Sequence, residues 1–543
     1  KGIRDEIPEE YLSHKEKYEN AVRKSVLLYK YICLNFVCFR ANLRNSLPAA
    51  VVKDNSPFML HSEMFIIAIM GQGTDEQKEY WLKRANNLEI MGTYAQTELG
   101  HGTFLRGLET TATYDANTEE FILNSPTLTA YKWWPGGLAH TANYCVVMAQ
   151  LLIKDKSYGI QPFMVQIRDE ETHMPLPGIQ VGEIGPKLGF NTVNNGFLGF
   201  DHVRIPRERM LMKNAQVLKD GTFKASPNSK LAYGTMVYVR VMIVNTVSKY
   251  LARAVTIAIR YSAIRRQSEP EPQILDYVTQ QHKLLIAIAT THAYHFTVRW
   301  LWDLYSNVNK DLSRGQLDNL PELHVLACSL KVVSSADCTA LIEKCRMACG
   351  GHGYMLSSCL PLLYGVSTAT CTYEGENTVL LLQAARYFIF SQKYGVSLVN
   401  VYNLFQAHAR VIVLTVYKAE VEKRSATLSA SLRAVIYQLL ELYFIFWTLE
   451  KLGDLLLYTK LSETDIRVLQ KKYEDLLENI RPNAVGLVDG FDFRDEILNS
   501  TLGAYDGRAY ERLMEEALKS PLNSEPVNQS FHKYLKPFMR GKL

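Results

Sequence analysis

The segment Phe121–Gly137, FILNSPTLTAYKWWPGG, decides the fold of this chain. It is a short β-prone run that ends in Pro135, Gly136 and Gly137, which is typical of a strand followed by a turn. Three similar runs follow it: FMVQIRD at Phe163–Asp169, PGIQVGEIG at Pro177–Gly185 and NNGFLGFDHVRIP at Asn194–Pro206. Together these runs predict a small β domain between about Ile90 and Met212.

The chain on both sides of this β domain has helical periodicity. From Glu9 to about Asn87, apolar residues recur every three or four positions, as in YENAVRKSVLLYKYI. The periodicity returns from Lys230, one long helix is expected to stop at Gly350 and Gly351, and a further bundle follows after about Ser391. The fold class is therefore mainly α with a central small β domain and an additional C-terminal helical bundle. A doubly wound sheet is excluded because strands and helices do not alternate. We place the domains at 1–91, 92–212, 213–395 and 396–543.

Length and composition exclude several classes of protein. The 543 residues are too many for one compact core, and 47% apolar with 21% charged residues is the balance of a soluble globular protein. A net charge of +5 is too small to indicate nucleic-acid binding. Nine cysteines without even spacing indicate a reducing compartment. The charged opening segment has no apolar core of a signal peptide.

The most apolar segment, Leu432–Tyr458, is interrupted by Arg433, Gln438, Glu441 and Glu450. These polar residues argue against a membrane span. We expect a buried helix here and no membrane span in the chain.

The sharpest chemical motif is CTYEGENTVLLLQAARYF at Cys371–Phe388. Glu374 precedes Gly375, and an apolar helix is expected from about Asn377, so the carboxylate should lie on a turn beside free amides of a helix N-terminus. Such amides can hold a carbonyl oxygen and stabilise an enolate while the carboxylate takes a proton. The alternative is that Glu374 and Glu376 only favour the start of the helix.

Other segments support more than one interpretation. Thr93–Thr103, TYAQTELGHGT, contacts a polar ligand or is a polar turn, and the tryptophan pair in WWPGG walls a flat ligand or is ordinary core. Arg240 interrupts the apolar run VYVRVMIV and either reaches solvent from a helix edge or meets a buried anion. Arg265 and Arg266 end a helix and either bind an anion or complement its dipole.

Nucleotide and metal motifs are weak or absent. The sequence has no GxGxxG after a strand and no Walker A loop. Cys345, Cys349 and His352 have zinc-like spacing, but no second pair accompanies them, and we expect no metal site.

In combination, these segments resemble the peroxisomal acyl-CoA oxidases, within the wider acyl-CoA dehydrogenase superfamily. The resemblance rests on motifs that occur in family order along most of the chain: TYAQTELGHGT, LETTATYD, WWPGGL, NNGFLGFDHVRIPRE, YGTMVYVR, RRQSEP, EPQILDY, ACGGHGY, TYEGENTV, RPNAVGLVDGFDF and KSPLN. It implies a helical domain, a central β domain, a flavin-binding helical bundle and a second C-terminal bundle. It also implies FAD, a homodimer and fatty acyl-CoA substrates.

The resemblance also assigns roles to individual residues. It makes Glu374 the base that removes the α-proton of the thioester. The implied flavin contacts are Tyr94, Ala95, Gln96, Thr97, Gly102, Thr103, Gly136, Gly351 and Glu376. The implied contacts across the dimer interface are Arg265, Gln280, Gln281, His282 and Lys283. The implied acyl-CoA contacts are Lys230, Leu231, Ala232, Tyr233, Arg240 and Tyr373.

The implied reaction is the first step of peroxisomal β-oxidation. It converts an acyl-CoA to a trans-2-enoyl-CoA, and molecular oxygen takes the electrons and becomes hydrogen peroxide. Two alternatives are an acyl-CoA dehydrogenase that uses a partner electron acceptor and a catalytically silent acyl-CoA-binding relative. The terminal Gly541, Lys542 and Leu543 resemble the address read by the peroxisomal import receptor, with Gly in place of Ser, so the expected location is the peroxisome.

The chain departs from the family pattern in two places. The join near Tyr394 to Ala409 and the segment RRQSEPEPQ are both shorter than in the family.

Overall fold

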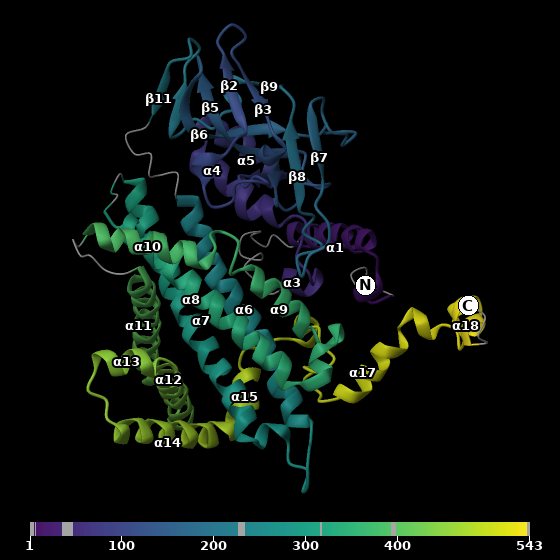
Figure 1. Ribbon diagram of the computed structural model, residues 1–543, viewed down its shortest axis with the longest axis vertical. Coiled ribbons are helices and arrows are strands. Elements are labelled where there is room, and N and C mark those ends of the chain that lie inside the picture. The colour runs from purple at the N-terminus through teal and green to yellow at the C-terminus, as the bar shows by residue number, and fades with distance from the viewer. Residues whose placement is uncertain are drawn as a thin grey trace.

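The computed structural model describes residues 5, 7–34, 47–225, 234–314, 316, 318–391 and 398–539. Helices come first, then a sheet region, and then two further helical regions (Figure 1). The predicted fold class is therefore confirmed. The domain boundaries given above remain predictions.

The N-terminal region is helical and packs beside the sheets. Its elements are η1 (Glu9–Tyr11), α1 (His14–Leu34), α3 (Leu47–Val51), the π-helical turn η2 (His61–Phe65), α4 (Ile66–Gln72) and α5 (Asp75–Asn86). A capping box between Thr74 and Gln77 starts α5. Trp81 of α5 and Phe65 of η2 are buried together with Tyr144 of the main sheet. This shared core fixes η2 and α5 against the β domain.

The β domain contains one large sheet. Its strands are β1 (Gly92–Ala95), β2 (Thr111–Asp115), β3 (Glu120–Asn124), β5 (Tyr144–Ile153), β6 (Lys156–Gln166) and β9 (Val203–Pro206). Their order is β1-β5-β2-β3-β9, with β6 paired to β5. Strand β1 runs parallel to β5, with Thr93 opposite Cys145. The segment TYAQTELGHGT therefore begins as a strand and only then becomes a loop.

Two smaller sheets complete the β domain. One has the order β4-β8-β7, formed by β4 (Lys132–Trp133), β8 (Gly196–Phe200) and β7 (Ile179–Glu183). The other pairs β10 (Ala215–Val217) with β11 (Phe223–Ala225), beyond the expected end at Met212. Three short 3-10 helices lie between strands: η3 (Leu105–Gly107), η4 (Leu128–Ala130) and η5 (Arg207–Arg209).

The central helical bundle begins with three long helices. They are α6 (Gly234–Ile264), α7 (Val278–Ser313) and α8 (Leu320–Ala348), followed by α9 (Leu360–Ala369) and α10 (Asn377–Ser391). The connections hold η7 (Ile274–Asp276), η8 (Gly350–Tyr354) and η9 (Leu356–Ser358). As the sequence predicted, α8 stops just before Gly350, whose φ is 61°. Leu251, Ile288 and Leu330 are fully buried where α6, α7 and α8 meet.

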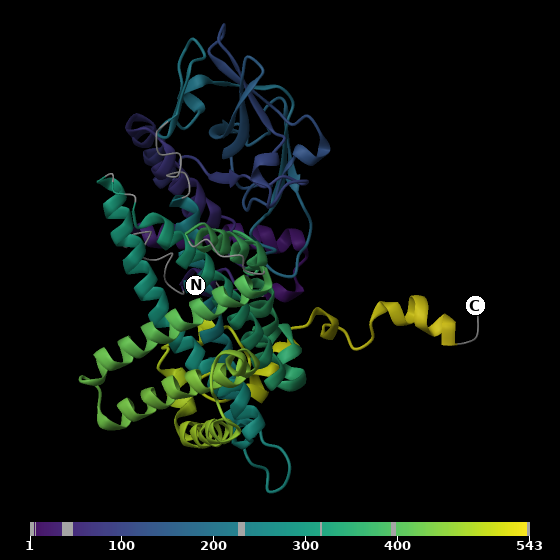
Figure 2. The same cartoon turned by 60° about the vertical axis from the view of Figure 1, so that its left-hand side comes forward.

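The C-terminal helices pack on the side of this bundle. They are α11 (Leu398–Ser425), α12 (Ala430–Glu450), α13 (Leu452–Tyr458), α14 (Glu463–Ile480), η10 (Arg481–Asn483), α15 (Ala484–Asp489) and α16 (Asp495–Leu498). The hairpin of α11 and α12 lies against the long helices (Figure 2). Arg410 of α11 donates two hydrogen bonds, of 2.6 and 2.7 Å, to the carboxylate of Asp337 on α8, which joins the two bundles.

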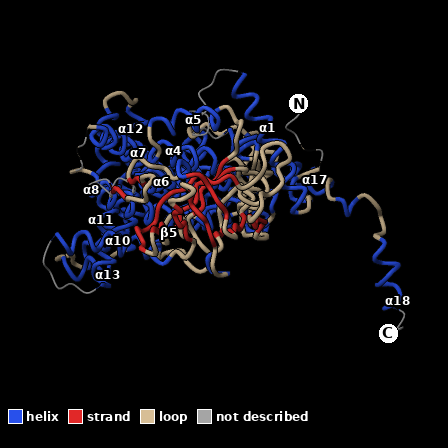
Figure 3. The backbone as a smooth tube through the Cα atoms, turned by 90° about the horizontal axis from the view of Figure 1, so that it is seen from above, coloured by secondary structure: helices blue, strands red, loops and turns tan. Residues whose placement is uncertain are grey.

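The last elements form an arm that leaves the body of the molecule. They are α17 (Ala509–Leu518), η11 (Pro521–Asn523), η12 (Phe531–Leu535) and α18 (Lys536–Met539). In Figure 3 the arm extends well beyond the other helices and strands. We call residues 509–539 the C-terminal arm.

Three described helices are long and apolar enough to span a membrane by length and composition: Met236–Ile264, Leu320–Ala348 and Ala430–Glu450. The most apolar windows of the first two are 78% and 83% buried in the bundle. The window of the third is only 33% buried, so the expectation of a single buried helix over Leu432–Tyr458 is wrong. That segment is two helices, α12 and α13. Helix α12 packs one side against α7, α11 and α14, while residues 430–434 at its start are exposed.

Candidate active site

Glu374 lies on the turn between α9 and α10. Its backbone is left-handed, with a φ of 58°, and Gly375 follows with a φ of 104°. A Cβ at position 375 would come within 2.5 Å of Leu380 Cδ2, so glycine is required there by both conformation and space. The turn presents the Glu374 side chain half-buried, and its carboxylate forms no hydrogen bond with any described residue.

Two buried cations hold this turn through its backbone. Arg240 of α6 donates from Nε to the Glu374 carbonyl oxygen at 3.2 Å. Lys331 of α8 donates from Nζ to the Gly375 carbonyl oxygen at 2.8 Å and to Asn377 Oδ1 at 2.9 Å. Neither cation is bonded to the Glu374 carboxylate. Arg240 is 5% exposed, so the interpretation that it reaches solvent is wrong. Within the chain it donates to the Glu374 carbonyl oxygen and to Cys328 Sγ, and its contact with an anion stays a prediction.

The surroundings raise the basicity of Glu374. Burial raises the pKa of its carboxyl above the usual value of 4.5, and the charges of Arg240 and Lys331 oppose that rise only in part. Burial also lowers the pKa of the Lys331 ammonium to about 8. A carboxylate with a raised pKa and no hydrogen-bond partner is suited to accept a proton from carbon.

The backbone amides that stay free belong to the turn before α10, whereas the sequence suggested the first amides of the helix itself. The Glu376 carboxylate accepts hydrogen bonds from the amides of Thr378 at 3.0 Å and Val379 at 3.3 Å, so the first amides of α10 are capped by the chain itself. The amides of Glu374, Gly375 and Glu376 instead donate to no described residue. These three amides are the available donors for a carbonyl oxygen.

Side chains from two regions lie around Glu374. Tyr94 of β1 and Tyr373 of the same turn each have a pKa raised first by burial and then by neighbouring charge, Glu374 included. Tyr373 also packs its ring edge against Phe190 of the β domain, with centroids 6.2 Å apart. The site thus lies where the β domain and the central bundle meet.

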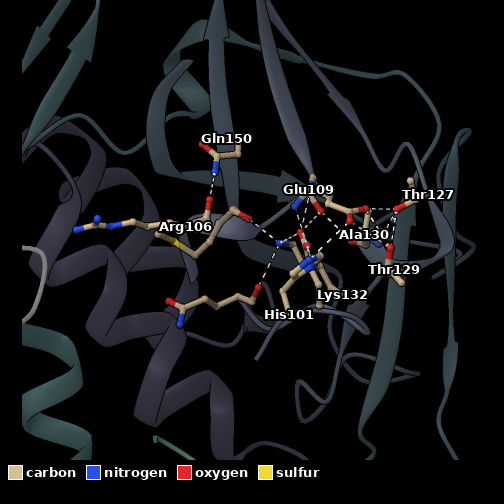
Figure 4. A network of polar contacts seen from close by, with 12 residues as sticks. His101, Arg106, Glu109, Thr127, Thr129, Ala130, Lys132 and Gln150 are labelled. Carbon is tan, nitrogen blue, oxygen red and sulfur yellow. Dashed lines mark hydrogen bonds and ion pairs between the residues drawn. The ribbon is translucent and has the colours of Figure 1, made fainter. Parts of the chain in front are cut away.

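The loop after β1 is tied down by a buried ion pair (Figure 4). Lys132 Nζ donates to Glu98 Oε1 at 2.9 Å, to the Gln96 carbonyl oxygen at 3.2 Å and to the Met148 carbonyl oxygen at 2.7 Å. Glu98 also accepts from Thr110 Oγ1 at 2.6 Å and from two backbone amides. Although burial raises it, the Lys132 charge and these hydrogen bonds hold the pKa of Glu98 below its usual value. This network fixes the backbone on either side of Thr97.

The other predicted flavin contacts of the β domain lie in two settings. Gly102 and Thr103 are exposed on the loop that follows Glu98. Gly136 is buried, its carbonyl oxygen accepts from Thr93 Oγ1 at 2.8 Å, and a Cβ would come within 2.5 Å of Val193. Trp133 stacks on Phe197, while Trp134 is 53% exposed.

Apart from the Glu374 turn, a polar cavity of about 500 Å³ lies beyond the C-terminal end of α6, and we call it the second cavity. Its lining includes Arg265, Gln280, Gly351 and His352, so the structure brings three of the predicted cofactor residues together here. Gln281, His282 and Lys283 do not line it. Gln281 bonds to the carbonyl oxygens of Leu275 and Asp276, and His282 bonds to Tyr473.

The remaining predicted residues contribute less. Lys230, Leu231, Ala232 and Tyr233 lie outside the described residues. Cys345 and Cys349 are buried thiols, and His352 Nδ1 pairs with the Tyr261 hydroxyl at 2.8 Å. Within the described part of the chain, no group of three His, Cys, Asp or Glu side chains has metal-binding geometry.

Sequence reasoning missed three residues of the site. Lys331 donates to the Gly375 carbonyl oxygen, the charge of Glu374 raises the pKa of Glu63, and the charge of Tyr250 raises the pKa of Tyr373. Glu63 and Lys331 are single charges in apolar segments, MLHSEMFII and CSLKVVSS. This is the signal that pointed to Arg240, and it was present for both. Tyr250 carries no such signal.

Comparison with known proteins gives the family. Four family models match in order: acyl-coenzyme A oxidase N-terminal at residues 2–91, acyl-CoA dehydrogenase middle domain at 93–203, acyl-CoA oxidase C-alpha1 domain at 233–389 and acyl-CoA oxidase at 391–540. Acyl-coenzyme A oxidase 1 of Drosophila melanogaster is 44% identical, with 100% of this chain and 93% of the relative covered. Peroxisomal acyl-coenzyme A oxidase 1 of Rattus norvegicus is 40% identical, with 98% and 92% covered.

A solved structure agrees with these relatives. Acyl-CoA oxidase-2 of Caenorhabditis elegans, bound with FAD, ascaroside-CoA and ATP, is 37% identical and superimposes with a TM-score of 0.93 over 99% of this chain and 91% of that one. The chain belongs to the acyl-CoA oxidase family. The predicted family and enzyme class are thereby confirmed. The alignment with the Drosophila protein runs over 620 positions against 543 residues here, so that relative has segments with no counterpart in this chain.

Proposed function

We propose that this chain oxidises fatty acyl-CoA thioesters to trans-2-enoyl-CoA, with FAD as cofactor and molecular oxygen as the final electron acceptor. The observation that carries the proposal is the Glu374 carboxylate, which has a raised pKa, no hydrogen-bond partner among the described residues, and three unused backbone amides beside it. This is the arrangement that removal of an α-proton requires.

The residues present fit FAD. Gly350 and Gly351 face open space in the second cavity, where an added Cβ would meet nothing within 4 Å, so their backbone can approach a diphosphate closely. Arg265 supplies a cation in the same cavity. In the β domain, Gln96, Thr97 and Thr103 offer amide and hydroxyl groups on a loop that Lys132 holds in place.

The chain and its cofactor have separate roles in this reaction. Glu374 takes the α-proton, and the amides of Glu374 and Gly375 stabilise the negative charge that develops on the thioester oxygen. Tyr373 and Arg240 border the acyl-CoA, with Arg240 acting through the backbone of the turn. FAD, when bound, would supply the acceptor for the β-hydrogen and the route of the electrons to molecular oxygen, so that hydrogen peroxide is the second product.

The test is the visible flavin spectrum of the purified holoenzyme mixed without air with a saturated fatty acyl-CoA. Bleaching, followed by rapid return of colour and release of peroxide when air is admitted, is the expected result. Bleaching that only an artificial electron acceptor reverses would indicate a dehydrogenase. No bleaching with any chain length would indicate a silent acyl-CoA-binding protein.

We also propose a homodimer, because the Glu374 turn and the Arg265 cavity lie at opposite ends of α6 in one chain. Arg240, beside Glu374, and Arg265, in the second cavity, are 25 residues apart along and just past α6, which corresponds to about 37 Å at 1.5 Å per residue. This separation exceeds the length of an extended FAD. A second copy that places its Arg265 cavity against the β domain would complete the site.

The C-terminal arm supports such an assembly. Its exposed apolar side chains are too numerous for a segment that stays in water: Tyr510, Met514, Leu518, Leu522, Tyr534, Leu535, Phe538 and Met539 are each at least 44% exposed. We expect the arm to pack on a second copy. Sedimentation should give a dimer, and Met514→Glu with Leu518→Glu should weaken both the dimer and FAD retention, whereas a monomer that keeps its FAD would refute this proposal.

The proposed location is the peroxisome, as the name of the rat relative states for that protein. Gly541, Lys542 and Leu543, outside the described residues, are the proposed signal for the import receptor. An N-terminally tagged chain should enter peroxisomes and should stay in the cytosol when these three residues are removed.

A further inference from the structure

The C-terminal chain crosses the end of α6 just before the C-terminal arm begins, and the reaction described above does not use this crossing. We call residues 489–508 the strap. Arg260 of α6 is 7% exposed, and it donates from Nε to Asp489 Oδ1 at 2.9 Å and from Nη1 to the Gly503 carbonyl oxygen at 2.8 Å. A Cβ on Gly503 would come within 2.8 Å of an isoleucine side chain of α6, so the strap backbone lies directly on the helix. The strap is therefore fixed to α6 shortly before Arg265, which lines the second cavity.

The strap is also tied to the other wall of the second cavity. Thr501 donates its amide to the Ser357 carbonyl oxygen at 2.9 Å and its hydroxyl to the same oxygen at 3.2 Å. Ser357 belongs to η9. The preceding turn, η8, contributes Gly350, Gly351 and His352 to the lining of the cavity. One short piece of chain thus holds both α6 and the turns that lead out of the cavity.

The chain that leaves the strap brings Tyr510, in the first turn of α17, to Arg265. Arg265 donates from Nη1 to the Tyr510 hydroxyl oxygen at 3.5 Å, and no carboxylate of the described residues forms an ion pair with this guanidinium. The hydroxyl keeps its own proton to donate, since no described residue accepts it. Tyr510 is 44% exposed, so a ligand can reach this hydroxyl. The Arg265 cation and the Tyr510 hydroxyl are therefore two adjacent donors with capacity left for an anion.

We propose that Tyr510 is a binding residue of the second cavity, where its hydroxyl and the Arg265 guanidinium donate hydrogen bonds to the diphosphate of the cofactor. The ligand class is a nucleotide with a diphosphate, because its anionic oxygens satisfy both donors. Tyr510 also belongs to the C-terminal arm, so docking of the arm on a second copy and retention of the cofactor depend on the same residue. This inference rests on the proposed function, which assigns the second cavity to the diphosphate of FAD.

The experiment measures the release of FAD from the purified holoenzyme by the rise of flavin fluorescence on dilution. Tyr510→Phe keeps the ring and removes only the hydroxyl, so it should raise the Kd for FAD about tenfold, as loss of one hydrogen bond to a charged group allows. Sedimentation with FAD in excess should give the same dimer, because the apolar surface of the arm is unchanged. Tyr505→Phe is the matched control and should leave the Kd for FAD unchanged, since the Tyr505 ring lies in the strap over the Arg260 guanidinium, 5.2 Å from its centroid.

A second comparison tests whether the contact is direct. In an Arg265→Gln background, Tyr510→Phe should still raise the Kd for FAD, and if it has no effect there, the hydroxyl acts only through Arg265 and the inference is wrong. An unchanged Kd in Tyr510→Phe alone would also overturn it, while bleaching of the flavin by an acyl-CoA would leave the proposed function standing. A wild-type protein that binds no FAD would overturn both.

Discussion

Glu98 in the β domain and Glu374 in the central bundle are two enclosed carboxylates near a lysine, and their surroundings are opposite. Glu98 is bonded to Lys132, to Thr110 and to two amides, and its pKa is held low. The Glu374 carboxylate forms no hydrogen bond with any residue that the structure describes, and its pKa is raised. Its cations, Arg240 and Lys331, bond to the backbone of the turn instead. A carboxylate with all its partners stabilises the fold, and one whose neighbours leave it free carries out chemistry.

The largest expected effect comes from removing the free carboxylate. Glu374→Gln should lower kcat by about 10²–10⁴ because it removes the base. The thermal midpoint should not fall, since no bond to the Glu374 carboxylate is lost. Single-turnover bleaching of the flavin measures the first quantity and a thermal melt measures the second. Glu343→Gln, elsewhere in the bundle, is the control, and near-normal turnover in Glu374→Gln would remove this residue from the mechanism.

Removing Lys132 from its ion pair with Glu98 should mainly lower stability, whereas removing the Glu374 carboxylate should mainly lower kcat. Lys132→Met leaves Glu98 buried without its cation, and breaking such a pair costs about 3–5 kcal/mol of stability. Urea denaturation followed by fluorescence measures this loss. The double variant with Glu98→Gln should recover part of it. An unchanged denaturation midpoint in Lys132→Met would contradict the structural role of the pair.

A smaller effect is expected when one cation behind Glu374 is removed. Lys331 lowers the pKa of Glu374, so Lys331→Met should raise that pKa further and move the acid limb of the kcat/KM profile to higher pH by about one unit. Lys344→Met, near the other end of α8, should leave the limb in place. A shift toward lower pH would show that Lys331 does not act on the base.

The smallest effect is on stability as a function of pH. The pKa of Glu98 is lowered on folding, so its contribution is complete above about pH 4.5 and is lost as the pH falls through the folded pKa. The pKa of Glu374 is raised, so stability falls as the pH rises from 4.5 through its folded pKa. Melts between pH 3 and 7 should show both slopes in the wild type, and Glu98→Gln and Glu374→Gln should each lose one of them. Parallel curves would contradict the assigned directions.

Much of the fold was predictable because its signals are local. The β-prone runs between helical segments gave the domain order, and Gly350 marked the end of α8. The partial exposure of α12 was not predictable, because it depends on which helices pack around it. The sequence motif also pointed to Glu374 directly.

The rest of the site depends on contacts between distant segments. Glu63 and Glu374 are 311 positions apart, and no periodicity relates them. The free amides were placed wrongly because the Glu376 carboxylate, two residues on, caps α10 itself. Local charge patterns suggested that Glu376 favours the helix start, but only the fold shows which amides remain for a ligand.

The way the Glu374 turn is held has an evolutionary consequence. Arg240 and Lys331 donate hydrogen bonds to main-chain carbonyl oxygens, so the conformation of the turn does not depend on which side chain is at position 374. The left-handed backbone there is tolerated best by glycine and asparagine. A single change from Glu374 to Asn would therefore yield a stable descendant that keeps its ligand sites and has lost its catalytic step. Non-enzymatic members can arise from this scaffold without passing through an unfolded intermediate form.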